Sequence, residues 1–494
     1  MTHLISRRGF LAGSTAASAA LVLPARVRAA PDAITLTATQ RTIEVGGRAA
    51  TVMGLVNAQG GLGLTLDPGQ RFRVDLTNAL DRETIVHWHG QIPPNAQDGV
   101  PNTNPMLVPG ETRAYDYVAR PGTFWMHSHI PAQEIGLLAA PLIVRSSADL
   151  AADRQEVVLF LHDFSFKAPD DVLREVTGGA GMNHATMGHG DARESGAMPG
   201  VSGMMGNNNM QGMGGMMGMG SMKMDLNDFD FDAYLANDRT LDDPEVVRVD
   251  RGGRVLLRAV NASAMTSFWI DLGAVRGRLV ATDGEDCVPH EASRFGFAPA
   301  QRLDIEIDMP ADRSALPVLC LREGARERTG VILAAAGTSI ARIAGVSDTE
   351  HPAFSGDLAQ EAALRAVTPL APREVARRHN VMLGGSMIPY RWTIDGQSWG
   401  NHTPLPVRTG ERVEMTFHNM SMMAHPMHLH GHVFQVVGVG MRRIAGALRD
   451  TLHVPPMSVV TIAFDAGEAA PWMFHCHHMG HMESGMVTEL QVQA

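Results

Sequence analysis

Short strand-like runs separated by turn signals recur along the whole chain, and long helical patterns are few. Turns such as Asp67-Pro68-Gly69 and Val108-Pro109-Gly110 are typical of strand ends. One run occurs at residues 71–78, 254–261 and 412–419, and each copy places an Arg seven residues before an Asn. A chain of 494 residues is too long for one ordinary core. The pattern therefore predicts an all-β protein made of three repeated β-sandwich domains.

The three copies differ at the positions nine and eleven residues after the Asn. These positions hold His87 and His89 in the first copy, Ile270 and Leu272 in the second, and His428 and His430 in the third. We therefore expect potential ligands in the outer copies and a spacer in the middle one, with these two apolar side chains in its core.

The densest group of potential metal ligands lies in residues 475–486. Alternate residues of a strand face opposite sides, so His475 and His477 share one face and Cys476 points to the other. The tripeptide can therefore hold two metal centres. Cys476, His481 and a weak axial Met486 need one more His to form a blue-copper site. The segment indicates one-electron chemistry delivered to a second, His-rich cluster.

Three further histidine motifs precede this segment: HWHG at 87–90, HSH at 127–129 and HPMHLHGH at 425–432. In order and spacing, the four motifs together resemble those of the multicopper oxidases. The resemblance covers essentially the whole mature chain. It implies cupredoxin-like Greek-key β-sandwich domains and an oxidoreductase, either a bacterial laccase-like enzyme or a cuprous oxidase of copper tolerance.

The resemblance also implies four copper ions and their ligands. It assigns the type 1 copper to His425, Cys476, His481 and Met486. It assigns the type 2 copper to His87 and His428, and the type 3 pair to His89, His127, His129, His430, His475 and His477. Because half of the trinuclear ligands come from each outer copy, this cluster is expected at the interface between the first and third domains.

The expected domain boundaries follow from the repeats and the composition. Residues 1–30 read as a signal peptide, 31–150 as a first cupredoxin domain with type 2 and type 3 ligands, and 151–345 as a second domain without copper ligands. Residues 346–494 read as a linker and a third domain with the type 1 site and the remaining ligands. The second domain contains a Met-rich insert at 179–224, with twelve of the chain's 31 methionines, which reads as a low-complexity loop.

The ends and the composition of the chain indicate its compartment. Ser6-Arg7-Arg8 before a weakly apolar run resembles a twin-arginine signal, which predicts export to the periplasm. No segment is long and apolar enough for a membrane span. The net charge of −11 gives nucleic-acid binding no support, and we expect a monomer. Cys287 and Cys320 are either a disulfide or two buried thiols.

In this family, single electrons from a reductant enter at type 1 copper and pass through Cys476, His475 and His477 to reduce O2 to water. Asp98 matches a carboxylate near the type 2 copper that relays protons, although a turn-forming role before Gly99 is equally open. Similar bacterial enzymes have a Glu directly after the last type 1 His. Here Glu483 comes one residue later, and we expect it as the candidate for that proton role.

The reductant is predicted from the methionines. Thioethers suit Cu(I), and Met420, Met422 and Met423 precede His425. Oxidation of Cu(I) to Cu(II) is therefore the favoured reaction, although Ser421 stands where Cu(I)-oxidising relatives have an Asp. The first alternative is a laccase-like oxidase of phenols or aromatic amines, and the second is a Met-rich copper-sequestering protein.

Overall fold

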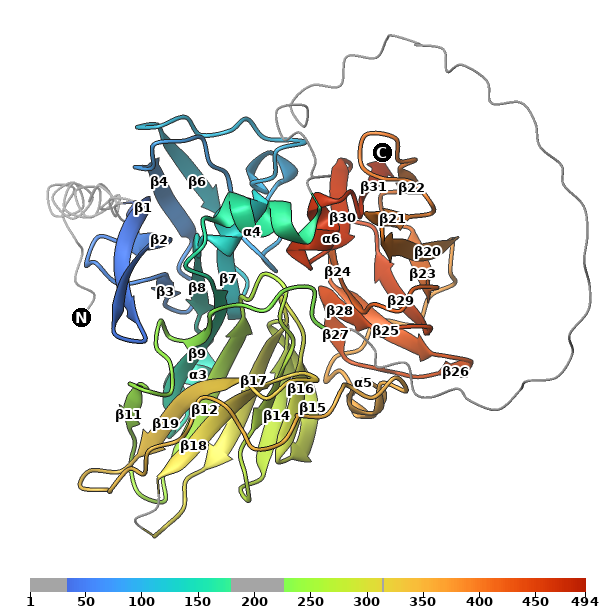
Figure 1. Cartoon of the computed structure of the whole chain (residues 1–494). Helices are drawn as coiled ribbons and strands as arrows, with labels where there is room; N and C mark the ends of the chain where they lie inside the picture. Colours follow the sequence, from blue (N-terminus) through green and yellow to red (C-terminus); the bar gives the residue numbers. More distant parts are fainter. Residues whose placement is uncertain (1–32, 179–225, 313–314) are drawn as a thin grey trace, which may run out of the picture.

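The computed structural model describes residues 33–178, 226–312 and 315–494. The predicted signal segment and the Met-rich insert therefore lie outside the described residues. The described chain forms three pairs of β-sheets, coloured blue to cyan, green to yellow and orange to red in Figure 1. The few short helices are η1 (Asn95–Gln97), α2 (Pro131–Ile135), α3 (Ser147–Ala151), α4 (Pro169–Val176), α5 (Ala359–Ala363) and α6 (Met479–Glu483). The all-β prediction is confirmed, and no helix among the described residues could cross a membrane.

The first pair consists of two four-stranded sheets, in the orders β2-β1-β4-β6 and β3-β8-β7-β5. Its strands are β1 (Ile34–Val45), β2 (Arg48–Asn57), β3 (Leu64–Leu66), β4 (Phe72–Asn78), β5 (Val86–His87), β6 (Thr112–Tyr117), β7 (Gly122–Ser128) and β8 (Ala139–Val144). In β4, buried residues alternate strictly with half-buried ones, which is the pattern of a strand with one face on a core. This pair has an apolar core of its own around Phe72 and Trp88.

The middle pair has a six-stranded sheet in the order β10-β9-β12-β17-β14-β15 and a five-stranded sheet in the order β11-β19-β18-β13-β16. Its strands are β9 (Gln155–Phe164), β10 (Ala233–Ala236), β11 (Val246–Arg248), β12 (Arg254–Asn261), β13 (Phe268–Asp271), β14 (Gly277–Thr282), β15 (Glu285–Ala292), β16 (Arg294–Phe297), β17 (Arg302–Asp308), β18 (Leu316–Arg322) and β19 (Arg328–Ala334). Ile270 and Leu272 are fully buried in its core, as the sequence predicts.

The third pair combines a seven-stranded sheet, ordered β21-β20-β23-β29-β25-β26 with β27 also on β25, and a five-stranded sheet, ordered β22-β31-β30-β24-β28. Its strands are β20 (Arg377–Met387), β21 (Tyr390–Ile394), β22 (Leu405–Arg408), β23 (Arg412–Asn419), β24 (His425–Leu429), β25 (Phe434–Val439), β26 (Arg442–Arg443), β27 (Leu448–Arg449), β28 (Thr451–Val454), β29 (Val459–Asp465), β30 (Pro471–Cys476) and β31 (Val487–Gln493). Its core is continuous with that of the middle pair.

The repeated Asn closes the same turn in all three pairs. Asn78, Asn261 and Asn419 end β4, β12 and β23 and are buried. The side-chain amide of each donates to a backbone carbonyl of a crossing segment, and its oxygen accepts the backbone N–H two residues later. A buried amide saturated in this way sets the direction of the chain where it leaves the strand. In the outer copies, that chain leads to the histidine motifs.

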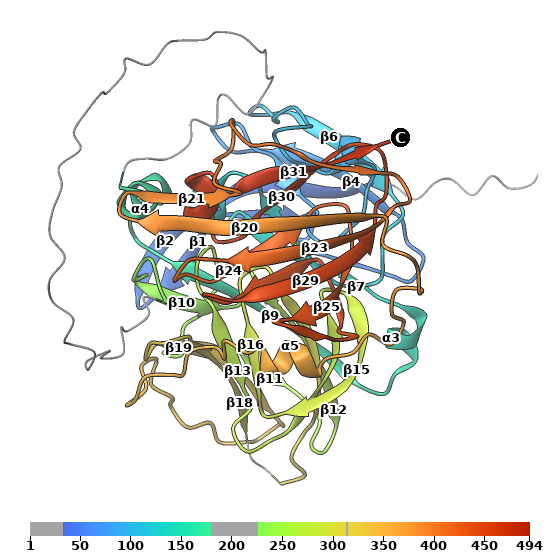
Figure 2. The same cartoon turned by 90° about the vertical axis from the view of Figure 1, so that its right-hand side faces the viewer.

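The three pairs pack so that the first and the third lie side by side above the middle one (Figure 1). The quarter turn of Figure 2 brings the third pair to the front and keeps the middle pair below it. Helices α2, α4 and α6 contact one another at the boundary between the outer pairs. The histidine-bearing strands of the first and third pairs therefore meet in the interior of the molecule.

Candidate metal centre

A first group of potential ligands surrounds Cys476 at the end of β30. Its Sγ lies 3.7 Å from Nδ1 of His425 on β24 and 3.5 Å from Nδ1 of His481 on α6. The two imidazole Nδ1 atoms are 3.1 Å apart, and all three side chains are fully buried. One thiol and two imidazoles converge here, which is the donor set of a blue-copper site.

Strand pairing explains why these residues meet. In the antiparallel ladder of β24 and β30, Met427 lies opposite Cys476 and His428 lies opposite His475. Opposite residues of a ladder share a face, so Met427 and Cys476 lie on the same face. Residues two apart along a strand also share a face, so His425 lies on the face of Met427 and Cys476. The other face carries the neighbouring histidines, as the sequence predicts.

Met486 lies close to this group through the backbone. Its N–H donates to the carbonyl of His481 at 3.0 Å, and its carbonyl accepts the N–H of Cys476 at 3.1 Å. The side chain is fully buried. The predicted axial role of its sulfur stays a prediction. Burial raises the pKa of the Cys476 thiol, so a thiolate at this position needs a metal partner.

The second group consists of eight buried histidines, none of which is more than 2% exposed. In one trio, Nε2 of His127 lies 3.4 Å from Nδ1 of His89 and 3.4 Å from Nε2 of His477. In another, Nε2 of His475 lies 3.3 Å from Nε2 of His129 and 3.1 Å from Nε2 of His430. His87 and His428 complete the group, with ring centroids 5.7 Å apart.

These rings have free acceptor atoms in an interior where free polar atoms are rare. Nε2 of His87 and Nε2 of His428 have no hydrogen-bond partner. Burial first, and then repulsion between neighbouring rings, lowers the pKa of His89, His127, His129, His428, His430, His475 and His477. Neutral imidazoles with unused nitrogens fit borderline metal ions such as copper.

Asp98 contacts two rings of the eight-histidine group, His87 and His430. Its Oδ2 lies 2.9 Å from Nδ1 of His430, and its carbonyl oxygen lies 2.8 Å from Nδ1 of His87. The residue is fully buried at the end of η1, and its Oδ1 has no hydrogen-bond partner. A carboxylate in this position orients both imidazoles through their outer nitrogens.

Three carboxylates at these groups were missed by the sequence reasoning. Oε2 of Glu134 on α2 lies 2.6 Å from Nδ1 of His127, and its Oε1 lies 3.7 Å from Nδ1 of His477. Asp450 contacts His89 at 3.2 Å, and Asp228 lies 3.4 Å from Nε2 of His481. Only Glu134 had a local signal, because it stands five residues after the second histidine of the HSH motif.

The remaining predicted residues are placed as follows. Glu483 is buried at the last position of α6, and its proton role stays a prediction. His432 and His478 belong to neither group: Nδ1 of His432 lies 2.9 Å from the carbonyl of His430, and the ring of His478 stacks on His481 at 3.9 Å. The sequence leaves Cys287 and Cys320 as either a disulfide or two buried thiols. In the structure both are buried and free, so they are two thiols.

Comparison with known proteins identifies the family. Matches to the family described as Multicopper oxidase cover residues 37–149 and 374–494, the segments that carry all four histidine motifs. The chain belongs to the multicopper oxidase family. It is an oxidoreductase of that family, and copper is its metal.

The similarity extends beyond the matched segments. The chain is 29% identical to Multicopper oxidase MmcO of Mycobacterium tuberculosis, over 98% of this chain and 96% of that protein. It is 25% identical to Copper resistance protein A of Escherichia coli, over 99% of both. The crystal structure of Fet3p, described as a multicopper oxidase that functions in iron import, superposes with a TM-score of 0.73 at 17% identity, over 93% of this chain and 90% of that one.

Proposed function

We propose that this multicopper oxidase takes single electrons from Cu(I) and uses them to reduce O2 to water. The proposed ligands are His425, Cys476, His481 and axial Met486 for type 1 copper. His87 and His428 hold type 2 copper, and the two trios of the eight-histidine group hold the type 3 pair. The four copper ions would supply one-electron acceptance at the type 1 site and four-electron reduction of O2 at the trinuclear site.

The arrangement of three consecutive residues carries this proposal. Cys476 belongs to the first group, and its neighbours His475 and His477 belong to the two trios of the second. The backbone therefore joins the two groups within one tripeptide. A protein that only stored copper would need neither a thiolate site nor this link, so the copper-sequestering alternative has little support.

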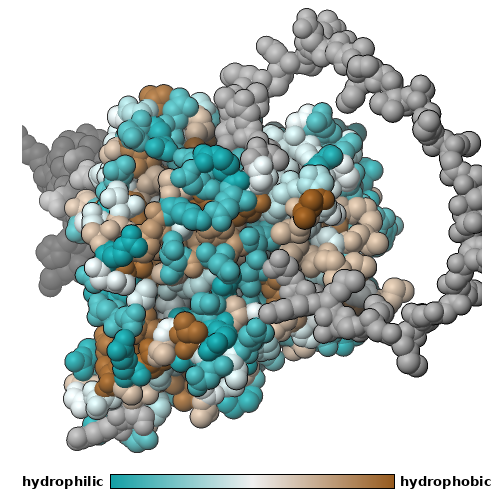
Figure 3. All heavy atoms as spheres, in the orientation of Figure 1, coloured by the Kyte–Doolittle hydropathy of each residue, from teal (hydrophilic) through white to brown (hydrophobic). Residues whose placement is uncertain are grey.

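The surroundings of His425 support Cu(I) as the reductant. Ser421 Oγ lies 2.9 Å from Nε2 of His425 and donates to the carbonyl of Met423 at 3.1 Å. Met420 and Met422, on either side of Ser421, are 60% and 53% exposed. On the face shown in Figure 3, mildly apolar residues cover part of the third sheet pair, and strongly apolar residues are scattered over the molecule between hydrophilic ones. Soft thioethers at the outer edge of a type 1 ligand suit Cu(I), and the name of the Escherichia coli relative points to copper resistance.

A buried carboxylate covers the other type 1 imidazole. Asp228 lies 3.4 Å from Nε2 of His481 and 3.7 Å from Nε2 of His478, and the Tyr390 hydroxyl donates to it. Burial alone would raise the pKa of Asp228, but the two histidine rings and Tyr390 lower it overall. A negative charge beside the electron entry point favours a cationic reductant.

The same carboxylate supports the laccase-like alternative. A phenol loses a proton as it loses an electron, and Asp228 is a proton acceptor next to the edge of His481. Cu(I) has no proton to give. Asp228→Asn is therefore expected to slow phenol oxidation more than Cu(I) oxidation.

The remaining parts of the proposal concern organisation and location. We propose three domains with boundaries near residues 150 and 345, each built on one sheet pair. We also propose export to the periplasm by the twin-arginine pathway and activity as a monomer. The relative named for copper resistance and the arginine pair near the N-terminus support export.

Oxygen consumption by the copper-loaded protein tests the function. We expect rapid uptake with Cu(I), slower uptake with a phenol such as 2,6-dimethoxyphenol, and four electrons used per O2. A double variant with Met420→Leu and Met422→Leu should have a higher KM for Cu(I) and an unchanged rate of phenol oxidation. Phenol turnover that exceeds Cu(I) turnover, with a KM for Cu(I) unaffected by the double variant, would make the laccase-like reaction the better assignment.

A further inference from the structure

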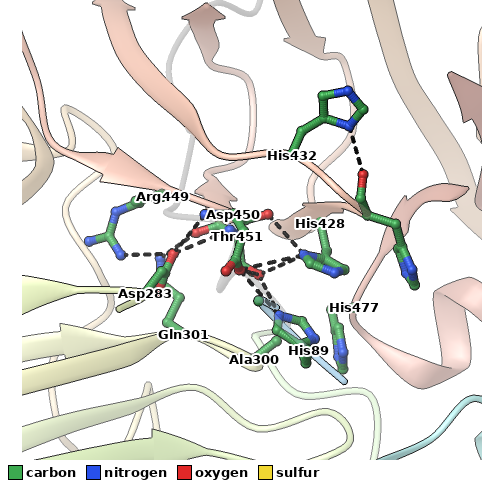
Figure 4. A network of polar contacts seen from close by, with 12 residues as sticks. His89, Asp283, Ala300, Gln301, His428, His432, Arg449, Asp450, Thr451 and His477 are labelled. Atoms are coloured by element: carbon green, nitrogen blue, oxygen red, sulfur yellow. Dashed lines mark hydrogen bonds and ion pairs between the residues drawn. The ribbon is translucent and has the colours of Figure 1, made fainter. Parts of the chain in front are cut away.

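Asp450 contacts two of the proposed copper ligands, one from the N-terminal part of the chain and one from the C-terminal part. Asp450, between β27 and β28, places Oδ1 3.2 Å from Nε2 of His89. Its carbonyl oxygen lies 2.9 Å from Nδ1 of His428 (Figure 4). Asp450 thus joins a type 3 ligand of the first sheet pair to a type 2 ligand of the third.

Asp450 also distinguishes His89 from the other rings. His87, His428, His430 and His475 each engage Nδ1 with a backbone or carboxylate oxygen, which leaves Nε2 toward the cluster. His89 is reversed: its Nε2 contacts Asp450 and the Thr451 hydroxyl at 3.1 Å, and its Nδ1 faces His127. The partners of the outer nitrogen decide which nitrogen an imidazole offers to a metal.

The middle sheet pair holds Asp450 in place. Arg302, the first residue of β17, donates Nη1 to Asp450 Oδ1 at 2.7 Å and Nη2 to Asp450 Oδ2. Both side chains are buried, and the two parallel bonds fix the plane of the carboxylate. Burial opposes ionisation of Asp450, but the Arg302 guanidinium lowers its pKa overall.

A second carboxylate, that of Asp283, holds the backbone of both Arg302 and Asp450. Oδ1 of Asp283 accepts the backbone N–H of Arg302 at 2.9 Å. Its Oδ2 accepts the backbone N–H groups of Asp450 and Thr451 at 3.3 and 3.2 Å. Asp283 therefore links Arg302, at the start of β17 in the middle pair, to the chain entering β28 of the third. Figure 4 shows its contacts with Arg449, Asp450 and Thr451.

We propose that Arg302 and Asp450 are positioning residues through which the middle sheet pair, which has no ligand histidine, fixes His89 and His428 for copper binding. The inference rests on the proposed function, because it takes these rings as type 3 and type 2 ligands. The middle domain then does more than separate the outer two: its docking on the third sheet pair sets the orientation of one ligand from each.

Arg258 provides a matched control. It lies on β12, the strand next to β17, and is as buried as Arg302. Its guanidinium pairs with Asp304 at 3.0 Å and with Glu156 at 2.7 Å. Neither partner contacts a histidine of the two groups in any described hydrogen bond or ion pair. Arg258→Lys should therefore lower the stability of the middle pair without touching the copper site.

The test compares Arg302→Lys, Asp450→Asn and Arg258→Lys as copper-loaded full-length proteins. Arg302→Lys keeps the charge but loses the paired bonds, and Asp450→Asn keeps the shape but loses the charge. Both should change the type 2 hyperfine splitting in the electron paramagnetic resonance spectrum. Both should also lose type 2 copper to a chelator at a roughly 10- to 100-fold lower chelator concentration. Arg258→Lys should keep the wild-type spectrum and chelator midpoint.

Two results would overturn the inference. One is a wild-type type 2 spectrum and chelator midpoint in both Arg302→Lys and Asp450→Asn. The other is an equal change in Arg258→Lys, which would mean general loosening. If Arg302→Lys does not fold, Asp450→Asn and Thr451→Val decide alone, and wild-type signals in both reject the inference. A wild-type protein that binds fewer than four copper ions, or shows no type 2 signal, would instead contradict the proposed function.

Discussion

The carboxylate of Glu134 lies 2.6 Å from Nδ1 of His127, and both side chains are buried between the first and third sheet pairs. The other oxygen of the same carboxylate lies 3.7 Å from Nδ1 of His477, so Glu134 faces two histidines of one trio. Burial and then the charge of Asp163 raise the pKa of Glu134 well above its ordinary value. Glu134 is thus placed to orient two rings of one trio, whereas Asp98 contacts His430 of the other trio.

We predict that Glu134→Gln lowers the turnover number for oxygen reduction by about 10- to 100-fold, as loss of a carboxylate behind a metal ligand generally does. The near-ultraviolet absorption of the type 3 pair should shift as well. Glu323→Gln replaces a buried carboxylate of the middle pair in the same way and should leave both quantities unchanged. Wild-type turnover and absorption in Glu134→Gln would reduce Glu134 to a packing residue.

Cys476→Ser should abolish the blue colour and the turnover. The cysteine supplies the thiolate of the candidate type 1 site, whose Sγ lies within 3.7 Å of both imidazole nitrogens. Cys476 is not among the proposed ligands of the other three copper ions, so these ions should remain bound. Visible absorption and copper analysis give the answer together, and a blue serine variant would refute the type 1 assignment.

Asp98→Asn should slow the oxygen-dependent half of the reaction. Asp98 is the carboxylate between His87 and His430, and the amide cannot relay a proton in the same way. After rapid mixing, the type 1 band should bleach at the normal rate and then recover about 10-fold or more slowly under oxygen. If recovery keeps the wild-type rate, Asp98 serves the turn before Gly99 and not proton supply.

Deletion of residues 179–224 should leave all four copper ions bound, because no proposed copper ligand lies in this insert. It should raise the KM for Cu(I), since several weak thioether sites increase the local copper concentration. Oxygen uptake at low and high Cu(I), beside uptake with a phenol, measures the effect. A deletion variant with unchanged rates for both reductants would mean that the insert is passive.

Glu323 predicts a pH dependence of stability away from the copper groups. Burial raises its pKa from 4.5 to about 7, even though it accepts the backbone N–H of Phe354. The folded protein then holds this proton more tightly than the unfolded one, so stability falls as pH rises from about 4.5 to 7. The loss is at most about 3 kcal/mol. Glu323→Gln should remove it.

Urea unfolding at pH 5 and pH 8.5 compares the two proteins. The variant should be the more stable one at pH 8.5 and should lose less stability between the two values. A wild-type and a variant protein with parallel pH profiles would show that Glu323 titrates near its ordinary pKa in the folded state.

The sequence by itself determined the fold class and the candidate ligands, for a local physical reason. Alternation along a strand places His475 and His477 on one face and Cys476 on the other, so the spacing of the motif already contains the two-site geometry. Likewise, the repeated Asn marks the same buried turn three times, and Ile270 and Leu272 show that the middle copy has an apolar core where the outer copies have ligands.

Only the tertiary structure decided what surrounds those ligands. Glu134 meets His477, Asp450 meets His89, and Asp228 meets His481 across hundreds of residues of chain. Apart from the short distance of Glu134 from the HSH motif, a lone acidic residue here has no periodicity or spacing that sets it apart from the other acidic side chains of the chain. Its role comes from the packing of one sheet pair against another, which removes its carboxylate from water and leaves an imidazole as its partner.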